Sequence, residues 1–208
     1  MLLNLLSSHL DPITLSILLF FEVCSLLVVL SVHEAAHAAA AARLGDNTAK
    51  VLGLLTLNPL AHIDPMGGLM ILLLGFGWGK AVPVNPYNLQ SPRRDLALIS
   101  FAGPASNFVM AAGLAGLFRL MGDTGVIGLV LTQLVSLNLA LGIFNLLPIS
   151  PLDGFKVVSG LLSFNLALDW EATARWGIFL LILLLMTPAF NTILYGPVGF
   201  LSRVLLGV

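Results

Sequence analysis

The sequence is poor in charged residues and in cysteine. Lys, Arg, Asp and Glu make up 9% of its 208 residues, hydrophobic residues make up 58%, and the mean hydropathy is +1.02. Soluble domains average about a quarter charged and about half apolar residues, so this composition indicates an integral membrane protein. A net charge of −1 without any basic run excludes the basic surface that nucleic-acid binding requires. The single cysteine, Cys24, excludes an intrachain disulfide.

The chain also lacks features that would divide it or mark a leader for removal. Its first twelve residues contain no Lys or Arg, unlike the positive start of a secretory signal, so we expect the N-terminus to be retained. No internal repeat and no linker rich in Pro, Gly or Ser is evident. We therefore expect one membrane-embedded domain over residues 1–208, with a core at about 13–160 and C-terminal helices at about 170–206.

Long apolar segments predict an all-α fold that crosses the membrane several times. A span needs about 20 apolar residues, and residues 13–42 contain neither glycine nor proline, which predicts one long helix ending near Gly45. The last apolar stretch is either a span or a helix in the membrane plane. The further predicted helices cover 95–118, 125–147, about 174–190 and 192–206.

Between the first two predicted spans the chain is apolar but broken by glycines and prolines. Irregular backbone at membrane depth is tolerated only against protein or a water-filled cavity. We therefore expect a re-entrant or broken segment at 66–78, followed by an extended edge strand at 80–87, KAVPVNPY.

Basic residues gather where the first predicted span ends and the second begins, whereas the turn at 119–124 has one Arg against one Asp. By the positive-inside rule, the basic group lies in the cytoplasm. The C-terminal ends of the first and third spans then share the cytoplasmic side. Separately, we expect the membrane to be a prokaryotic plasma membrane. The basic group comprises Arg43, Lys50, Lys80, Arg93 and Arg94.

The pattern H-E-x-x-H occurs as HEAAH, residues 33–37, inside the first predicted helix. Histidines four residues apart lie on one helix face, so His33 and His37 can bind one Zn²⁺. Glu34 lies about 100° around the helix, where a general base can take a proton from water activated by the metal. Ionisable residues inside a span cost roughly 2.5–3.5 kcal/mol each on insertion scales, which makes them functional candidates. The alternative is a solvated turn at the membrane boundary.

A catalytic zinc site needs a third protein ligand and an open position. The segment FNLLPISPLDGFK, residues 144–156, follows the third predicted span, and the predicted topology brings Asp153 to the side and depth of the histidines. We expect Asp153 to complete a zinc site with His33 and His37. The alternative is that Asp153 caps a helix at 155–163.

HEAAH in a membrane helix, followed by NLLPISPLDG, resembles the site-2 protease family of intramembrane zinc metalloproteases. The resemblance extends through NPLAHIDPMGG, FGWGKAVPVNPYN and FAGPASN, over about residues 20–160. It implies a three-helix catalytic core, one zinc per chain held by the two histidines and Asp153, and Glu34 as the base. It also implies regulated intramembrane proteolysis of a single-span membrane protein. Without a PDZ-sized insertion, the chain is similar to minimal members of the family.

Other polar residues have two readings each. Asn107 and Asn145 can donate hydrogen bonds to substrate or to a developing oxyanion, or can bond between helices. Glu22 lies three helical turns before the first histidine, so we expect it to face the bundle interior. His62 and Asp64 form an alternative metal pair, although Asp-Pro and Asn-Pro turns favour a loop role. The competing function is a membrane metal transporter or channel.

Overall fold

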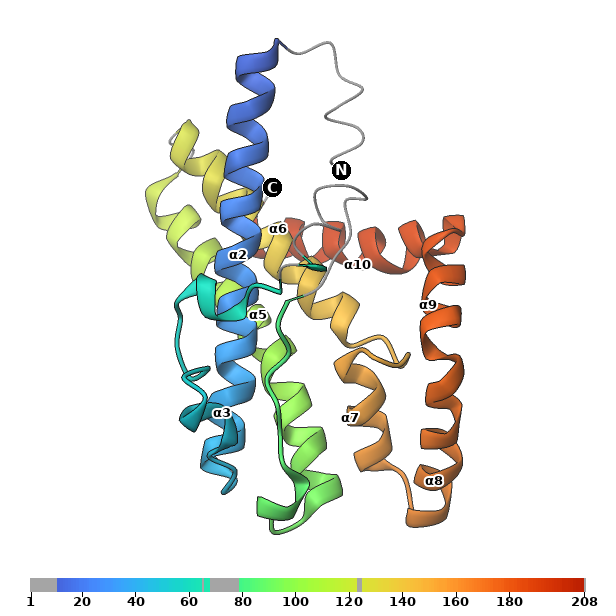
Figure 1. Ribbon diagram of the computed structural model, residues 1–208. Coiled ribbons are helices and arrows are strands. Elements are labelled where there is room, and N and C mark those ends of the chain that lie inside the picture. Colours follow the sequence, from blue (N-terminus) through green and yellow to red (C-terminus); the bar gives the residue numbers. More distant parts are fainter. Residues whose placement is uncertain (1–10, 65, 68–78, 123–124, 208) are drawn as a thin grey trace.

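The computed structural model describes residues 11–64, 66–67, 79–122 and 125–207, and helices dominate these ranges (Figure 1). Among the described residues, four helices are long and apolar enough to cross a membrane. The predictions of an all-α fold and of several helices long enough to span a membrane are therefore confirmed for these residues. The four helices are α2 (Pro12–Arg43), α5 (Pro92–Met121), α6 (Val126–Asn145) and α10 (Pro188–Leu206).

Helix α2 confirms the long helix predicted at 13–42. The Asp11 carboxylate accepts amide hydrogen bonds from the first turn, which starts the helix. The helix ends where Gly45 adopts a φ of 109° and the Asp46 amide donates to the Ala41 carbonyl, a conformation that glycine tolerates. Its 32 residues extend about 48 Å, longer than the ~30 Å hydrocarbon core. The HEAAH motif lies in the C-terminal half of this helix.

Helix α5 lies at the centre of the bundle, where it contacts α2, α6 and α7 (Figure 1). It and α6 confirm the spans predicted at 95–118 and 125–147, and their short connection makes them antiparallel neighbours. Small side chains at the contacts let the helix backbones approach closely; they include the fully buried Ala41 between α2 and α5, and Ala111 between α5 and α6. This close approach brings α5 against the histidine face of α2.

The predicted strand at 80–87 is wrong: residues 80–85 form no strand, and 86–88 form a short 3-10 helix, η2 (Pro86–Asn88). Two prolines in this stretch have no N–H to donate to a sheet. The main-chain amides of this stretch bond to side chains instead. The Val82 amide donates to Glu34 of α2 at 3.3 Å, and the Asn85 amide donates to Asp46 in the loop after α2 at 2.7 Å. The segment therefore runs along α2.

Two short helices precede this segment, α3 (Thr48–Val51) and the 3-10 helix η1 (Pro59–His62). Near it, Ile63 and Gly79 form an isolated antiparallel bridge. The predicted re-entrant segment at 66–78 lies outside the described residues, apart from 66–67.

The C-terminal part contains four elements before the last helix, and they correct the span predicted at 174–190. Thr187 is extended, with φ −100° and ψ 150°, and Pro188 begins α10, because a residue before proline avoids the helical region. The helix preceding this break is only nine residues long. In Figure 1, α10 lies crosswise to α2, which favours the in-plane alternative for 192–206. The four elements are α7 (Asp153–Leu161), α8 (Phe164–Ala172), η3 (Thr173–Trp176) and α9 (Gly177–Leu185).

Candidate metal centre

Two histidines and one aspartate from distant parts of the chain meet between α2 and α7. Nε2 of His33 lies 3.1 Å from Nε2 of His37, and both nitrogens lie 3.1 Å from Oδ2 of Asp153. The histidines are buried and the aspartate is mostly buried. Among the described residues, this is the group of His, Cys, Asp and Glu side chains whose ligand atoms are close enough to share a metal ion. The structure thus brings together the three residues nominated as zinc ligands.

Asp153 reaches the histidines because α7 begins with it. The N-cap of α7 is Leu152, and Asp153 lies inside the first turn, so the structure contradicts the alternative in which Asp153 caps a helix at 155–163. At the next residue, Gly154, an added Cβ would lie 2.2 Å from the carbonyl oxygen of Leu146. Glycine at this position lets the start of α7 pack against the end of α6, which holds the aspartate at the histidines.

The protonation of the two imidazoles follows from their other ring nitrogens. Nδ1 of His37 donates to the main-chain carbonyl oxygen of Ile99 at 2.7 Å. Nδ1 of His33 donates to Oδ1 of Asn107 at 2.6 Å. Since carbonyl oxygens only accept, each Nδ1 carries a proton, and in a neutral ring Nε2 then carries a lone pair.

These atoms suit a metal ion. Two imidazole lone pairs and a carboxylate oxygen that face one another at 3.1 Å repel unless a cation lies among them. In a tetrahedral zinc site with bonds of about 2.0–2.1 Å, ligand atoms lie roughly 3.3–3.4 Å apart, close to this spacing. Two histidines, one carboxylate and an open fourth position are also typical of catalytic zinc. The residues present therefore fit zinc.

A glycine on α5 provides the space for both histidine rings. A Cβ added at Gly103 would lie 2.4 Å from Nε2 of His37 and 2.7 Å from Cε1 of His33. Any larger residue at this position would therefore collide with the candidate ligands. Sequence reasoning missed the contributions of Gly103 and Ile99, although the glycine belongs to the quoted FAGPASN segment.

Glu34 lies next to the three-residue cluster but outside it. The residue is partly exposed, whereas the histidines on either side of it in the motif are buried. Its carboxylate accepts the Val82 amide at 3.3 Å, so the segment 79–85 passes the carboxylate that the sequence nominated as a base.

The two candidate asparagines make different contacts. Asn107 is fully buried between α2 and α6, where its Nδ2 donates to Asn138 and its Oδ1 accepts from His33. Asn145 donates to the Leu141 carbonyl of its own helix at 3.1 Å, which uses one of the two N–H groups of its amide.

Three other predictions concern residues away from the cluster. Glu22 accepts a hydrogen bond from Gln133 of α6, which confirms that it faces the bundle. His62 and Asp64 are not part of a metal cluster among the described residues. His62 donates from Nε2 to the Thr56 carbonyl, and Asp64 accepts a nearby main-chain amide, so their predicted loop roles are confirmed.

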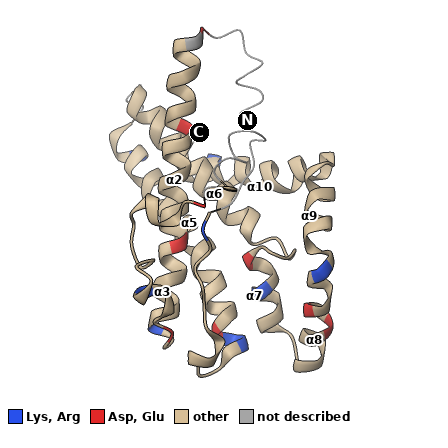
Figure 2. Ribbon diagram, viewed as in Figure 1, with Lys and Arg blue, Asp and Glu red and all other residues tan. Residues whose placement is uncertain are grey.

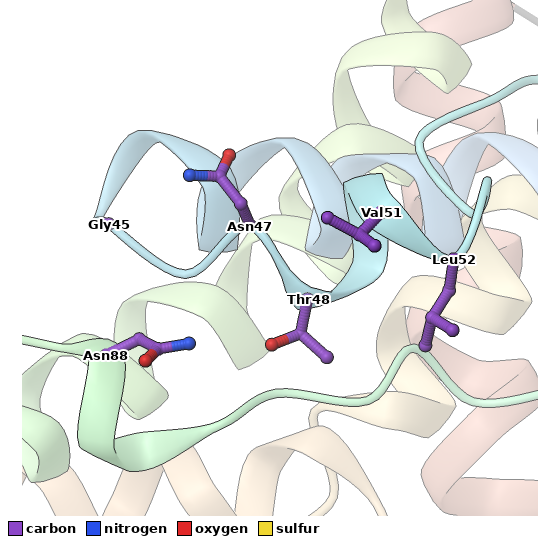
Figure 3. Close-up of a pocket in the computed structure, with 6 residues that line it drawn as sticks. All are labelled: Gly45, Asn47, Thr48, Val51, Leu52 and Asn88. Carbon is purple, nitrogen blue, oxygen red and sulfur yellow. The ribbon is translucent and has the colours of Figure 1, made fainter.

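A shallow hollow lies where the chain leaves α2 (Figure 3). In that view the side chains of Thr48 and Asn88 point toward each other, and both donate to the buried Asp46. Burial acts to raise the pKa of Asp46, but hydrogen bonds from Thr48, Asn88 and Asn85 outweigh it and lower the pKa to about 2. Asp46 is therefore a structural carboxylate that holds two of the residues lining the hollow. Its lining residues are Gly45, Asn47, Thr48, Val51, Leu52 and Asn88.

Comparison with known proteins shows what the chain is similar to. It is 38% identical over 184 residues to "Putative zinc metalloprotease YwhC" of Bacillus subtilis, covering 84% of each chain. It is 35% identical to "Putative zinc metalloprotease Rip2" of Mycolicibacterium smegmatis, covering 79% of this chain and 66% of the relative. It is 33% identical to the Rip2 protein of Mycobacterium tuberculosis, covering 84% of this chain and 70% of the relative. No protein-family model and no solved structure matches the chain.

Proposed function

Because the chain belongs to the zinc metalloprotease family of YwhC and Rip2, we propose that it is an intramembrane endopeptidase of the site-2 type. It hydrolyses a peptide bond in or near the transmembrane segment of a single-span membrane protein. The observation that carries this proposal is the cluster of His33, His37 and Asp153 among apolar helices of membrane length. In this proposal, α2, α5 and α6 form the catalytic core.

One zinc ion per chain is the proposed cofactor, held by Nε2 of each histidine and Oδ2 of Asp153. Zinc supplies Lewis-acid chemistry, which polarises a carbonyl group and makes water nucleophilic near neutral pH. The hydrogen bonds from Nδ1 of each imidazole to Ile99 and Asn107 hold the rings in the orientation and tautomer that a metal ligand requires.

Glu34 is the proposed general base. Its carboxylate accepts a proton from the attacking water, whose oxygen adds to the scissile carbonyl carbon. When the carbon–nitrogen bond breaks, Glu34 passes the proton to the leaving nitrogen and regains its charge for the next turnover. Its partial exposure supports this role, since a base must reach both water and substrate.

The substrate must unwind at the cleavage point, because a helix hydrogen-bonds its own carbonyl groups. Residues 79–85 run past Glu34, and in this proposal their main-chain groups bond with the main chain of an unwound substrate, as in strand addition. The proposed substrate therefore lies between this segment and the metal centre.

The proposed orientation places the metal centre toward the cytoplasm of a prokaryotic cell. Figure 2 shows charged residues gathered at the end of the bundle that contains α3, the start of α5, and helices α7 and α8. Basic residues favour the cytoplasmic side. His37 lies six residues before the end of α2, about 9 Å along the axis, which brings the site near the same end.

Cleavage of a single-span substrate by the purified protein in detergent tests the proposal, with zinc quantified in each sample. The wild type should cleave, and Glu34→Gln should bind equal zinc without cleaving. Glu22→Gln is the matched control, because it removes a carboxylate from the same helix away from the metal centre, and it should cleave. Cleavage by Glu34→Gln would refute the assigned base. Zinc flux through proteoliposomes without any cleavage would replace the protease with the transporter alternative.

A further inference from the structure

A chain of three hydrogen bonds links the backbone of α6 to a candidate zinc ligand on α2. Nδ2 of Asn138 donates to the Leu134 carbonyl oxygen at 2.8 Å. Nδ2 of Asn107 donates to Oδ1 of Asn138 at 3.1 Å, and Nδ1 of His33 lies 2.6 Å from Oδ1 of Asn107. Both asparagines are fully buried, so neither amide exchanges these partners for bulk water.

The direction of every bond in this chain follows from its first acceptor. The Leu134 carbonyl can only accept, so Asn138 must present its amide nitrogen there and its oxygen to Asn107. Asn107 must then present its nitrogen to Asn138 and its oxygen to His33. The histidine therefore donates from Nδ1, which leaves the lone pair on Nε2, the atom that faces His37 and Asp153.

We propose that Asn138 is a positioning residue that fixes the amide orientation of Asn107, and through it the tautomer of His33 and the affinity of the site for zinc. This inference rests on the proposed zinc site. The side chain of Asn138 hydrogen-bonds to Asn107 and to the Leu134 carbonyl of its own helix, so it acts on the site through Asn107.

The two histidines differ in how they are held, and this difference explains the need for Asn138. His37 donates to a main-chain carbonyl, which cannot turn to present a donor. His33 donates to a side-chain amide, which presents a donor after a half-turn. With that amide reversed, Nδ1 of His33 would have to accept, Nε2 would carry the proton, and the ring would no longer be a ligand at that atom.

The packing of α5 against α6 also supports the positioning role of Asn138. A Cβ added at Gly142, one turn after Asn138, would lie 3.3 Å from Cβ of Asn107. Glycine therefore lets α6 approach α5 where the two amides meet. A buried amide pair in a membrane bundle must satisfy its hydrogen bonds internally, and these two do so in the one pattern that ends at His33.

Zinc affinity, measured by competition with a chromophoric chelator, tests the inference in the full-length protein in detergent. Asn138→Leu removes the acceptor for Asn107 and should weaken zinc binding about 10- to 100-fold, the range typical of lost outer-shell partners. Asn138→Ser should weaken it similarly, because its hydroxyl bonds to its own helix but is too short to hold Asn107. This smaller side chain keeps the test available if the leucine variant does not fold.

Leu139→Ala is the matched control, since Leu139 is the next residue on α6, is equally buried and packs in the core. It should lower the melting temperature of the zinc-free protein while zinc affinity stays at the wild-type value. Asn138→Asp should restore near-wild-type affinity, because a carboxyl group buried here is neutral and both donates and accepts.

Wild-type zinc affinity in Asn138→Leu or Asn138→Ser would overturn this inference and leave the proposed function in place. Equal losses of affinity in Leu139→Ala and Asn138→Leu would also overturn it, because general packing would then control the site. A wild-type protein that binds no zinc would overturn the proposed function and this inference with it.

Discussion

Replacing Gly103 by alanine tests whether α5 sets the geometry of the metal centre. The new methyl group would lie 2.4 Å from Nε2 and 2.5 Å from Cε1 of His37, and 2.7 Å from Cε1 of His33. Real Cβ atoms essentially never approach closer than 3.0 Å, so the rings or the helices must move. The His37 ring cannot turn away freely, because its Nδ1 is held by the Ile99 carbonyl.

Overpacking of this kind costs about 1–3 kcal/mol, and here it falls on the candidate ligands themselves. We therefore expect Gly103→Ala to lose most zinc affinity and most cleavage, measured by chelator competition and by the single-span substrate assay. Gly116→Ala on the same helix is the control, because a Cβ there meets no atom within 4 Å. Alanine at a helical glycine stabilises by roughly 0.5–1 kcal/mol, so the control should keep wild-type zinc affinity and wild-type cleavage. Wild-type zinc affinity in Gly103→Ala would refute this account of the site.

Three further predictions concern the metal and the turn after α2. Asp153→Ala should reduce the bound zinc per chain, measured by metal analysis after desalting, because it removes one of three proposed ligands; unchanged zinc content would contradict the assignment. Chelation of zinc should lower the melting temperature of both the wild type and Glu34→Gln by similar amounts, since the metal stabilises only the folded state and Glu34 is not a proposed ligand. The pKa of Asp46 is lowered to about 2 from an ordinary 3.8, so its stabilisation is complete above about pH 4 and is lost as the pH falls toward 2. Thermal unfolding of Asp46→Asn should accordingly depend less on pH in that window, and parallel curves for the two proteins would count against it.

The parts of the fold that sequence predicted best are those governed by local rules. An unbroken apolar run and a glycine stop predicted α2, and a four-residue spacing placed His33 and His37 on one face. The alternating direction predicted for the spans placed Asp153 at the end of the bundle that holds the histidines, and the structure brings the three side chains together there. Local rules failed at 80–87, where an extended segment found side-chain acceptors instead of a neighbouring strand. They also failed at 174–190, where Pro188 divides the predicted span.

The outer contacts of the site were not predictable, because they depend on how helices meet. Ile99 contributes a main-chain carbonyl, which every residue has, so its side chain gives no signal. Asn138 shares α6 with two other side-chain amides, Gln133 and Asn145, and the sequence does not say which of the three faces Asn107 of α5. Gly103 is one of 20 glycines, and only the distance between α2 and α5 shows why it must be small. Their contributions come from the register of packed helices.

The period of the α-helix also explains how adjacent residues serve opposite requirements. The proposed metal ligands need fixed geometry, and His33 and His37 lie buried against Gly103 of α5. A general base needs access to water and substrate, and Glu34, about 100° around the helix, faces the segment at Val82 with part of its surface exposed. One turn of α2 therefore presents a buried face and a partly exposed face side by side. Moving Glu34 by one residue in either direction would break this arrangement, because the carboxylate would leave the face that the segment 79–85 lines.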